Sequence, residues 1–187
     1  MARKTGTAPT KAIKQGISAQ RSPESALFRN LFRRKTRPPT NQEFLATLPL
    51  FEGLVKRELK KVAGIIHERH YTAGETIFEQ GTPGAALFIV KTGTVDLVRQ
   101  DGAGRDVATL ATLNEGMFFG EGALLHEEKR AMSARASEAT DVLAFFRGDL
   151  DVLIKSAPAI GGKILLRLAW VLNRRLQTAM EEHFSRA

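Results

Sequence analysis

The chain has 187 residues, of which 43% are hydrophobic, enough to form the core of one domain with a tail. It contains no cysteine, which excludes disulfides, thiolate metal sites and cysteine nucleophiles. The net charge of +8 is uneven, because residues 1–41 hold ten of the 28 Lys and Arg residues but one of the 20 acidic residues. The basic character therefore belongs to the N-terminal segment and does not indicate a nucleic-acid surface over the whole domain.

The N-terminal segment has two predicted parts. Residues 1–21 have almost no large apolar groups and are expected to form a disordered basic tail. Residues 22–40 are expected to form a basic amphipathic helix, with Ser22 as its N-cap, followed by a linker at Pro38-Pro39. Four readings of this segment stay open: a solvated tail, an anchor in which residues 22–35 lie on a membrane or nucleic acid, docking onto a protein, and an organelle presequence.

Residues 41–187 are expected to form one α+β domain, mainly β. A helical pattern over 41–66 is interrupted by Pro49. From about 67 to 147, short apolar runs alternate with glycines, which predicts an antiparallel β-roll or jelly roll. The expected strands are Thr76–Phe78, Ala86–Val90, Thr94–Val98, Val107–Leu110, Ala131–Ala136 and Asp141–Phe146.

The last part of the domain, 149–186, is predicted to be helical. A short helix over Asp149–Ile154 is expected to end at Pro158, and a long helix follows over 160–184. The leucines on one side of the long helix are explained by core packing, and a lid or a homodimer contact is the functional alternative. No apolar run is long enough to span a bilayer.

The candidate site is Phe118–Leu125 together with Lys129–Ser133. Glu121 and Arg130 stand nine residues apart, around a Gly-rich turn. A carboxylate accepts hydrogen bonds from hydroxyls, a guanidinium donates two parallel bonds to a phosphate, and glycines let backbone N–H groups approach an anion. The same pattern also suits a structural turn with a surface ion pair.

The order helix, β-roll, helix resembles the cyclic-nucleotide-binding domain family, which includes regulatory subunits of cAMP-dependent protein kinase, cyclic-nucleotide-gated channels and the bacterial catabolite activator protein. The resemblance covers about residues 48–180 and includes Ala73–Gly81, Pro83-Gly84, Leu87–Val90 and Gly93–Val95 in family-like order. It implies that the candidate site is the family's phosphate-binding cassette, with Glu121 on the ribose 2′-hydroxyl and Arg130 on the cyclic phosphate. The remaining implied binding residues are Gly120, Gly122, Ala123, Ala131 and Ser133.

Three positions in the cassette bear on the choice of ligand. Lys129 stands where the family usually has Pro, and Met132 replaces a small residue and could crowd the base pocket. Some cGMP-preferring members carry Thr at the position of Ala131, so cAMP is favoured over cGMP. If the long helix acts as a lid, Trp170 or a nearby leucine could stack over the purine, as an alternative to core packing.

The resemblance implies a regulatory module and no enzyme. No histidine has metal-ligand spacing with acids and no Ser/His/Asp arrangement stands out, so neither a metal nor a catalytic residue is assigned. The expected partners are a cyclic nucleotide and an unidentified protein, reached through the C-terminal helix or the basic N-terminal segment, with a homodimer as one form. We expect no helix-turn-helix contact with DNA and a cytoplasmic location. The alternative is an adaptor subunit that binds no ligand and docks through its N-terminal segment.

Overall fold

The structure, a computed structural model, describes residues 37–185, apart from the side chains at 182 and 183. The chain divides into two units, 1–38 and 39–187, and the description below concerns the second. The predicted tail over 1–21 and amphipathic helix over 22–35 lie outside the described residues.

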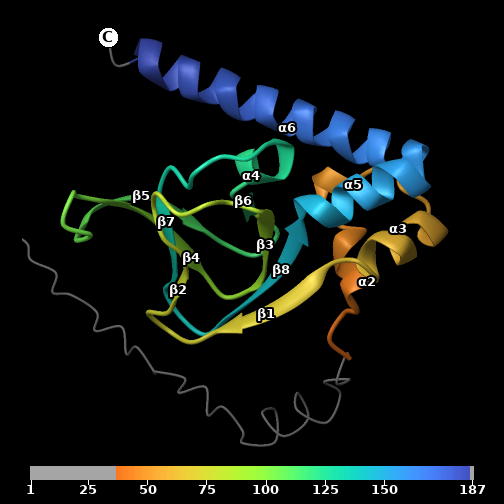
Figure 1. Ribbon diagram of the computed structural model, residues 1–187, viewed down its shortest axis with the longest axis horizontal. Coiled ribbons are helices and arrows are strands. Elements are labelled where there is room, and N and C mark those ends of the chain that lie inside the picture. Colours follow the sequence, from red (N-terminus) through yellow and green to blue (C-terminus); the bar gives the residue numbers. More distant parts are fainter. Residues whose placement is uncertain (1–36, 186–187) are drawn as a thin grey trace, which may run out of the picture. The chain divides into compact units, whose positions relative to one another are not determined.

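Two four-stranded antiparallel sheets form the roll (Figure 1). One sheet has the strand order β1-β8-β3-β6 and the other has the order β2-β7-β4-β5. The antiparallel β-roll expected from the Gly-punctuated sequence is thereby confirmed. The strands are β1 (His67–Tyr71), β2 (Thr76–Phe78), β3 (Ala86–Thr92), β4 (Val95–Gln100), β5 (Asp106–Leu113), β6 (Phe118–Phe119), β7 (Ser133–Ala136) and β8 (Thr140–Phe146).

Two of these strands were not among those expected. Strand β1 reads His-Glu-Arg-His-Tyr and is mostly exposed, so it lacks the apolar alternation that identifies a half-buried strand. It pairs with β8 at the edge of its sheet. Strand β6 has two residues and pairs with β3 through Phe88 and Ile89. Both strands exist because of long-range pairing that local patterns do not report.

Helices gather at one end of the roll and along one side (Figure 1). Helix α6 begins at Pro158, which the sequence had suggested only as the end of the preceding helix. Proline suits the first helical position, where its missing N–H would have no partner. The helical elements are α2 (Asn41–Leu45), the 3₁₀ turn η1 (Pro49–Phe51), α3 (Lys56–Ala63), α4 (Gly122–Leu125), α5 (Arg147–Ser156) and α6 (Pro158–Ser185). None of the described helices is both long and apolar enough to cross a membrane.

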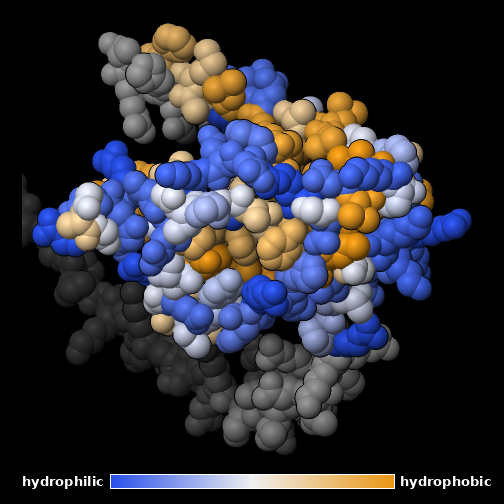
Figure 2. Space-filling model, in the orientation of Figure 1, coloured by the Kyte–Doolittle hydropathy of each residue, from blue (hydrophilic) through white to orange (hydrophobic). Residues whose placement is uncertain are grey.

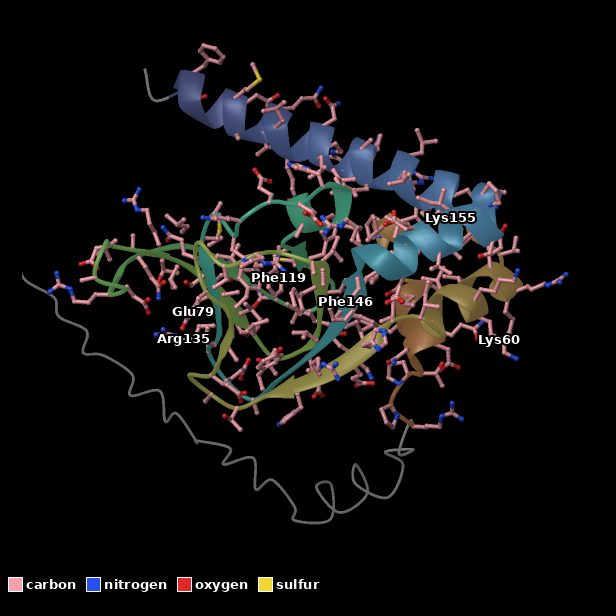
Figure 3. The ribbon with its side chains drawn as sticks, viewed as in Figure 1. Lys60, Glu79, Phe119, Arg135, Phe146 and Lys155 are labelled. Atoms are coloured by element: carbon pink, nitrogen blue, oxygen red, sulfur yellow. The ribbon has the colours of Figure 1, made fainter. Side chains whose placement is uncertain are left out.

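The buried apolar side chains form two clusters. One joins the helices to the outer face of β3 and β8 and includes Phe51, Phe145 and Ile164. The other fills the space between the sheets and includes Phe88 and Phe119. In Figure 3, Phe119 lies in the interior of the roll, whereas Arg135 lies toward its outside. The interior cluster therefore packs against the segment from β6 to α4.

The two halves of α6 differ in burial. The first half packs on the domain through Ile160, Ile164 and Leu168, which are buried. Beyond it, Leu176, Met180 and Phe184 are exposed, and Leu166 and Trp170 are exposed as well. Figure 2 shows hydrophobic surface along this helix and a second hydrophobic area on the roll below it. The distal half of α6 thus extends past the core that holds the proximal half.

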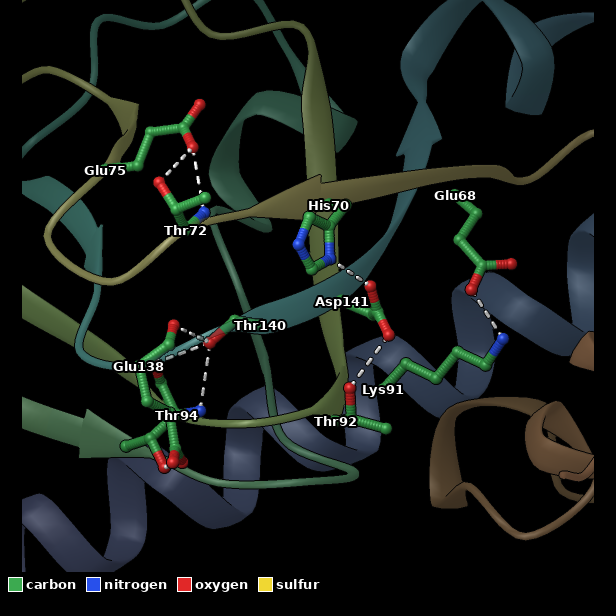
Figure 4. Close-up of polar contacts among 10 residues, drawn as sticks. All are labelled: Glu68, His70, Thr72, Glu75, Lys91, Thr92, Thr94, Glu138, Thr140 and Asp141. Carbon is green, nitrogen blue, oxygen red and sulfur yellow. Dashed lines mark hydrogen bonds and ion pairs between the residues drawn. The ribbon is translucent and has the colours of Figure 1, made fainter.

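A network of polar side chains links neighbouring strands of the roll (Figure 4). Asp141 on β8 accepts hydrogen bonds from His70 at 2.8 Å and from the Thr92 hydroxyl at 3.0 Å. Lys91 pairs with Glu68 at 2.6 Å. These contacts join β1, β3 and β8.

Candidate functional site

A cavity of about 480 Å³ opens between the interior of the roll and α6. Its lining comes from β2, β4, β5, the segment from Met117 to Ala123, the segment from Glu128 to Met132, and Arg175 of α6. The lining brings together most of the residues that the sequence nominated, namely Gly120, Glu121, Gly122, Ala123, Arg130 and Ala131.

Arg130 forms the inner end of the cavity. Its side chain is largely buried, with 8% of the residue exposed. One guanidinium nitrogen, Nη2, donates to the carbonyl of Ala86 at 2.9 Å, and Nη1 donates to the carbonyl of Gly120 at 3.2 Å. The guanidinium carbon lies 4.1 Å from the centre of the Phe78 ring, a cation–π distance. The arginine is thereby held by main-chain carbonyls and an aromatic face.

Backbone pairing fixes the position of Arg130 before its side chain makes any contact. Its amide donates to the carbonyl of Thr82 at 2.9 Å, and its carbonyl accepts from the amide of Gly81 at 2.8 Å. Gly120 has a φ of +72°, and a Cβ there would lie 2.5 Å from Nη1 of Arg130. Only glycine combines this backbone conformation with so close an approach of the guanidinium.

The charge of Arg130 has no carboxylate counterion among residues 37–185. Burial lowers the pKa of its guanidinium below the ordinary value, because desolvation disfavours the charged form. An arginine nevertheless stays protonated in proteins at neutral pH. A buried cation with dipolar partners alone is costly, and an anion entering the cavity would offset that cost. Chemically, this end of the site suits a phosphate.

Glu121 forms the other polar end of the cavity and stands at the N-cap of α4. Its Oε1 accepts from Nη1 of Arg175 at 3.1 Å, and its side chain is 23% exposed. Nη2 of Arg175 donates to the Phe118 carbonyl at 2.9 Å, and the guanidinium lies 4.2 Å from the centre of the Phe118 ring. Among the described residues, no hydrogen bond is found to Oε2, which leaves that oxygen available to a ligand hydroxyl.

Arg175 is the site residue that the sequence analysis missed. It lies 54 positions from Glu121, so no local motif connects them. One signal was present in the sequence: Arg175 follows Leu168 by seven residues and Leu172 by three, which places a cation on the leucine side of α6. A charge that continues an apolar helical stripe can mark a contact with a polar group on the surface beneath.

The walls between the two charged ends are apolar. They are formed by Leu97 on β4, Ala111 and Leu113 on β5, and the side chains of Met117 and Met132. Methionine side chains are flexible and adapt to flat or irregular groups. The cavity therefore combines a cation, a carboxylate and an apolar compartment suited to a planar ring.

One residue expected at the site, Ser133, and one candidate for a cap, Trp170, lie outside the cavity lining. Ser133 is buried outside the cavity lining, where its hydroxyl donates to Oε1 of Gln100 at 2.8 Å and accepts from the Gln80 amide at 2.8 Å. Trp170 lines an adjoining groove and carries the guanidinium of Arg174 at 5.2 Å from its ring. Ser133 supports the strands next to the segment Glu128–Met132, and Trp170 is not among the residues that line the cavity.

The backbone amides at the start of α4 are a second expected contact with the ligand. The amide of Ala123 donates to the Gly120 carbonyl at 3.3 Å, a long hydrogen bond that an anion could replace.

Within residues 37–185, no cluster of three or more His, Cys, Asp or Glu side chains could hold a metal ion.

The fold and the cavity have counterparts among known proteins. Residues 68–157 match the model of the cyclic nucleotide-binding domain family. The cyclic AMP receptor protein of Thermus thermophilus is 41% identical over 131 residues, which are 70% of this chain and 58% of that protein. The cGMP-dependent protein kinase egl-4 of Caenorhabditis briggsae is 32% identical over 120 residues, which are 60% of this chain and 16% of the kinase. The chain thus spans under three fifths of the length of either relative.

A solved structure extends the likeness to three dimensions. The Thermus thermophilus catabolite activator protein superposes with a TM-score of 0.62 at 41% identity, over 72% of this chain and 61% of that one. The matched segment contains the strands of the roll, both charged ends of the cavity and α5. These matches and the fold together show that residues 68–157 form a domain of the cyclic nucleotide-binding domain family.

Proposed function

We propose that this protein is a regulatory module that binds a cyclic nucleotide without transforming it. The cyclic phosphate pairs with the guanidinium of Arg130, and the ribose 2′-hydroxyl donates to the carboxylate of Glu121. Gly120, Gly122, Ala123 and Ala131 bring backbone groups close to the phosphate and the sugar. The purine occupies the apolar compartment between Leu97, Leu113 and Met132.

One observation carries this proposal: a buried arginine that pairs with no carboxylate of the described residues faces a cavity that has a carboxylate at its other end. Arg130 is 8% exposed and has only carbonyl and aromatic partners among the described residues. A ligand with one anionic group and one hydroxyl satisfies both ends at once. A cyclic nucleotide has these groups on one rigid ring system.

The favoured ligand is cAMP, with cGMP as the alternative. Ala131 lines the cavity and has no side-chain hydroxyl to bond to a guanine amino group. The first relative is named for cyclic AMP, whereas the second is a cGMP-dependent kinase. The absence of a side-chain hydroxyl at Ala131 favours cAMP over cGMP.

The output of the module would pass through α6. This helix contacts the site through Arg175 and exposes apolar side chains at Leu176, Met180 and Phe184. Ligand binding would shift the population of α6 positions and so change a contact with a protein partner or a second copy of the chain. The N-terminal segment is the other candidate for that contact, and it could also bind a membrane surface.

Titration calorimetry tests the proposal directly. The full chain is titrated with cAMP, cGMP and adenosine, and we expect saturable heat with cAMP, weaker binding of cGMP and none with adenosine. Arg130→Gln should weaken cAMP binding by at least about a hundredfold, because each lost hydrogen bond to a charged group accounts for about 1.5–3 kcal/mol.

Arg135→Gln is the matched control, because Arg135 lies outside this cavity and pairs with Asp106. It should bind cAMP as the wild type does. An absence of heat with either cyclic nucleotide at high concentration would favour the adaptor alternative. Binding that persists in Arg130→Gln would contradict the site assignment.

A further inference from the structure

We infer that Arg175 is a positioning residue that sets the module's preference for a 2′-hydroxyl by holding the carboxylate of Glu121. The inference rests on the proposed function, because it concerns how one end of the same site recognises the sugar. It assigns to α6 a direct part in ligand selectivity, in addition to its part in the output.

The geometry around Arg175 defines a clamp with three contacts. Its guanidinium donates to Oε1 of Glu121 and to the carbonyl of Phe118, and it stacks over the Phe118 ring. Phe118 is itself buried and belongs to β6, two positions before Gly120. The guanidinium is therefore fixed against the roll by two contacts that do not involve Glu121, and it can orient the carboxylate.

The clamp leaves Oε2 of Glu121 without a hydrogen bond to any described residue. A carboxylate has two oxygens and can accept from a guanidinium and a hydroxyl together. With Oε1 held by Arg175, Oε2 presents a fixed acceptor to the ligand. Without Arg175, the glutamate would have to be ordered by the ligand itself, and each immobilised flexible side chain reduces affinity.

Competition between Arg175 and the ligand for Glu121 would give a different prediction. If Arg175 occupied the position of the ribose, it would compete with the nucleotide for Glu121, and its removal would strengthen binding. The two contacts of Arg175 with Phe118 argue against such competition, because they keep the guanidinium in place when the hydroxyl arrives. The direction of the change on removing Arg175 therefore decides between support and competition.

The experiment compares cAMP with 2′-deoxy-cAMP, a ligand that lacks only the hydroxyl in question. For the wild type we expect a preference for cAMP of about tenfold, the size of one hydrogen bond to a charged acceptor. In Arg175→Gln the preference should fall to within about threefold, while affinity for 2′-deoxy-cAMP changes by less than about threefold. A general loss of structure would lower affinity for both ligands equally.

Two neighbouring arginines supply matched controls. Arg174→Gln removes the adjacent charge, which stacks on Trp170, and Arg167→Gln removes another ion pair of α6, the one to Glu52. Both should keep the wild-type preference. Thermal melting checks that each variant is folded, and Arg175→Lys, which keeps the charge but not the fork, replaces Arg175→Gln if the latter does not fold.

The outcomes separate this inference from the proposed function. A wild type that binds neither ligand overturns both. A wild type that binds the two ligands equally well, or an Arg175→Gln variant with an unchanged or increased preference, overturns the positioning role and leaves cyclic-nucleotide binding standing.

Discussion

The two charged ends of the cavity are built in different ways. The Arg130 end is assembled wholly within the roll, from main-chain carbonyls, phenyl rings and a glycine that leaves room for the guanidinium. The Glu121 end is completed by Arg175, a side chain from a helix that starts after the last strand. One end is therefore fixed by the roll, whereas the other depends on where α6 lies.

Under the proposed function, the two ends would have different tasks. The Arg130 end does not depend on α6 and would hold the phosphate wherever that helix lies. The end that depends on α6 is the one through which occupancy and helix position can influence each other, since coupling between two sites is reciprocal. The following four changes test this division, from the largest expected effect to the smallest.

The first change is Arg130→Lys, which keeps the positive charge and removes the fork. A lysine cannot donate in parallel to a phosphate while also reaching the carbonyls of Ala86 and Gly120. We expect cAMP affinity to fall by about thirtyfold, measured by calorimetry. Arg135→Lys should leave it unchanged. An affinity within about threefold of wild type would mean that charge alone suffices at this end.

The second change is Gly120→Ala, with Gly74→Ala as its control. Both glycines have positive φ, so both substitutions should lower the free energy of unfolding by about 1–2 kcal/mol in urea titrations. Only at Gly120 does the new Cβ meet Nη1 of Arg130, at 2.5 Å, whereas nothing lies within 4 Å at Gly74. Affinity for cAMP should fall by about tenfold in Gly120→Ala alone. Equal losses of affinity would show that backbone strain, not displacement of Arg130, is responsible.

The third change is Glu121→Gln, which removes the charge at the end that faces α6. We expect about fivefold weaker cAMP binding and a change in the free energy of unfolding below about 1 kcal/mol, because the Glu121–Arg175 pair is partly exposed. Glu128→Gln is the control, since that carboxylate also lines the cavity but pairs with His126. If Glu128→Gln weakened binding as much, the effect would come from the overall field of the cavity.

The fourth change is Asp141→Asn, which lies away from both ends of the cavity and should affect stability alone. The hydrogen bond from His70, aided by Thr92 and by the charges of His70 and Lys91, lowers the pKa of Asp141, although desolvation opposes this. The folded protein thus binds the Asp141 proton less tightly than the unfolded chain does. Its carboxylate stabilises the fold above the unfolded pKa of about 3.9, and this contribution is lost as pH falls through the lowered folded-state pKa.

Asp141→Asn should accordingly lower the free energy of unfolding near neutral pH, by about 1 kcal/mol or less because the side chain is partly exposed. The difference from wild type should shrink below about pH 4, as followed by urea titrations at several pH values. Affinity for cAMP at neutral pH should not change. A difference that grew in acid would contradict the role given to this carboxylate.

Features that depend on short-range spacing in the sequence could be predicted, whereas features that depend on contacts between distant residues could not. Strands β2 to β5, β7 and β8 could be identified from local spacing around glycines, and so could the shared location of Glu121 and Arg130, which line one cavity. Strands β1 and β6 and Arg175 could not, because a polar edge strand, a strand of two residues and a contact 54 residues away leave no periodic pattern. Ser133 is the opposite case: the sequence predicted that it would contact a ligand, whereas in the structure its hydroxyl donates to Gln100.

The unequal burial of α6 has a mechanical consequence. Lys163 and Arg167 pair with Glu58 and Glu52, and packing on the core ends near Leu172, so the helix is held firmly up to that residue and has one further support at Arg175. At 1.5 Å per residue, that support lies about 5 Å beyond Leu172 and Ser185 about 20 Å beyond it. A small displacement of the support would move the end of the helix about four times as far, so sub-ångström changes at a carboxylate could reach a partner as a shift of an ångström or more.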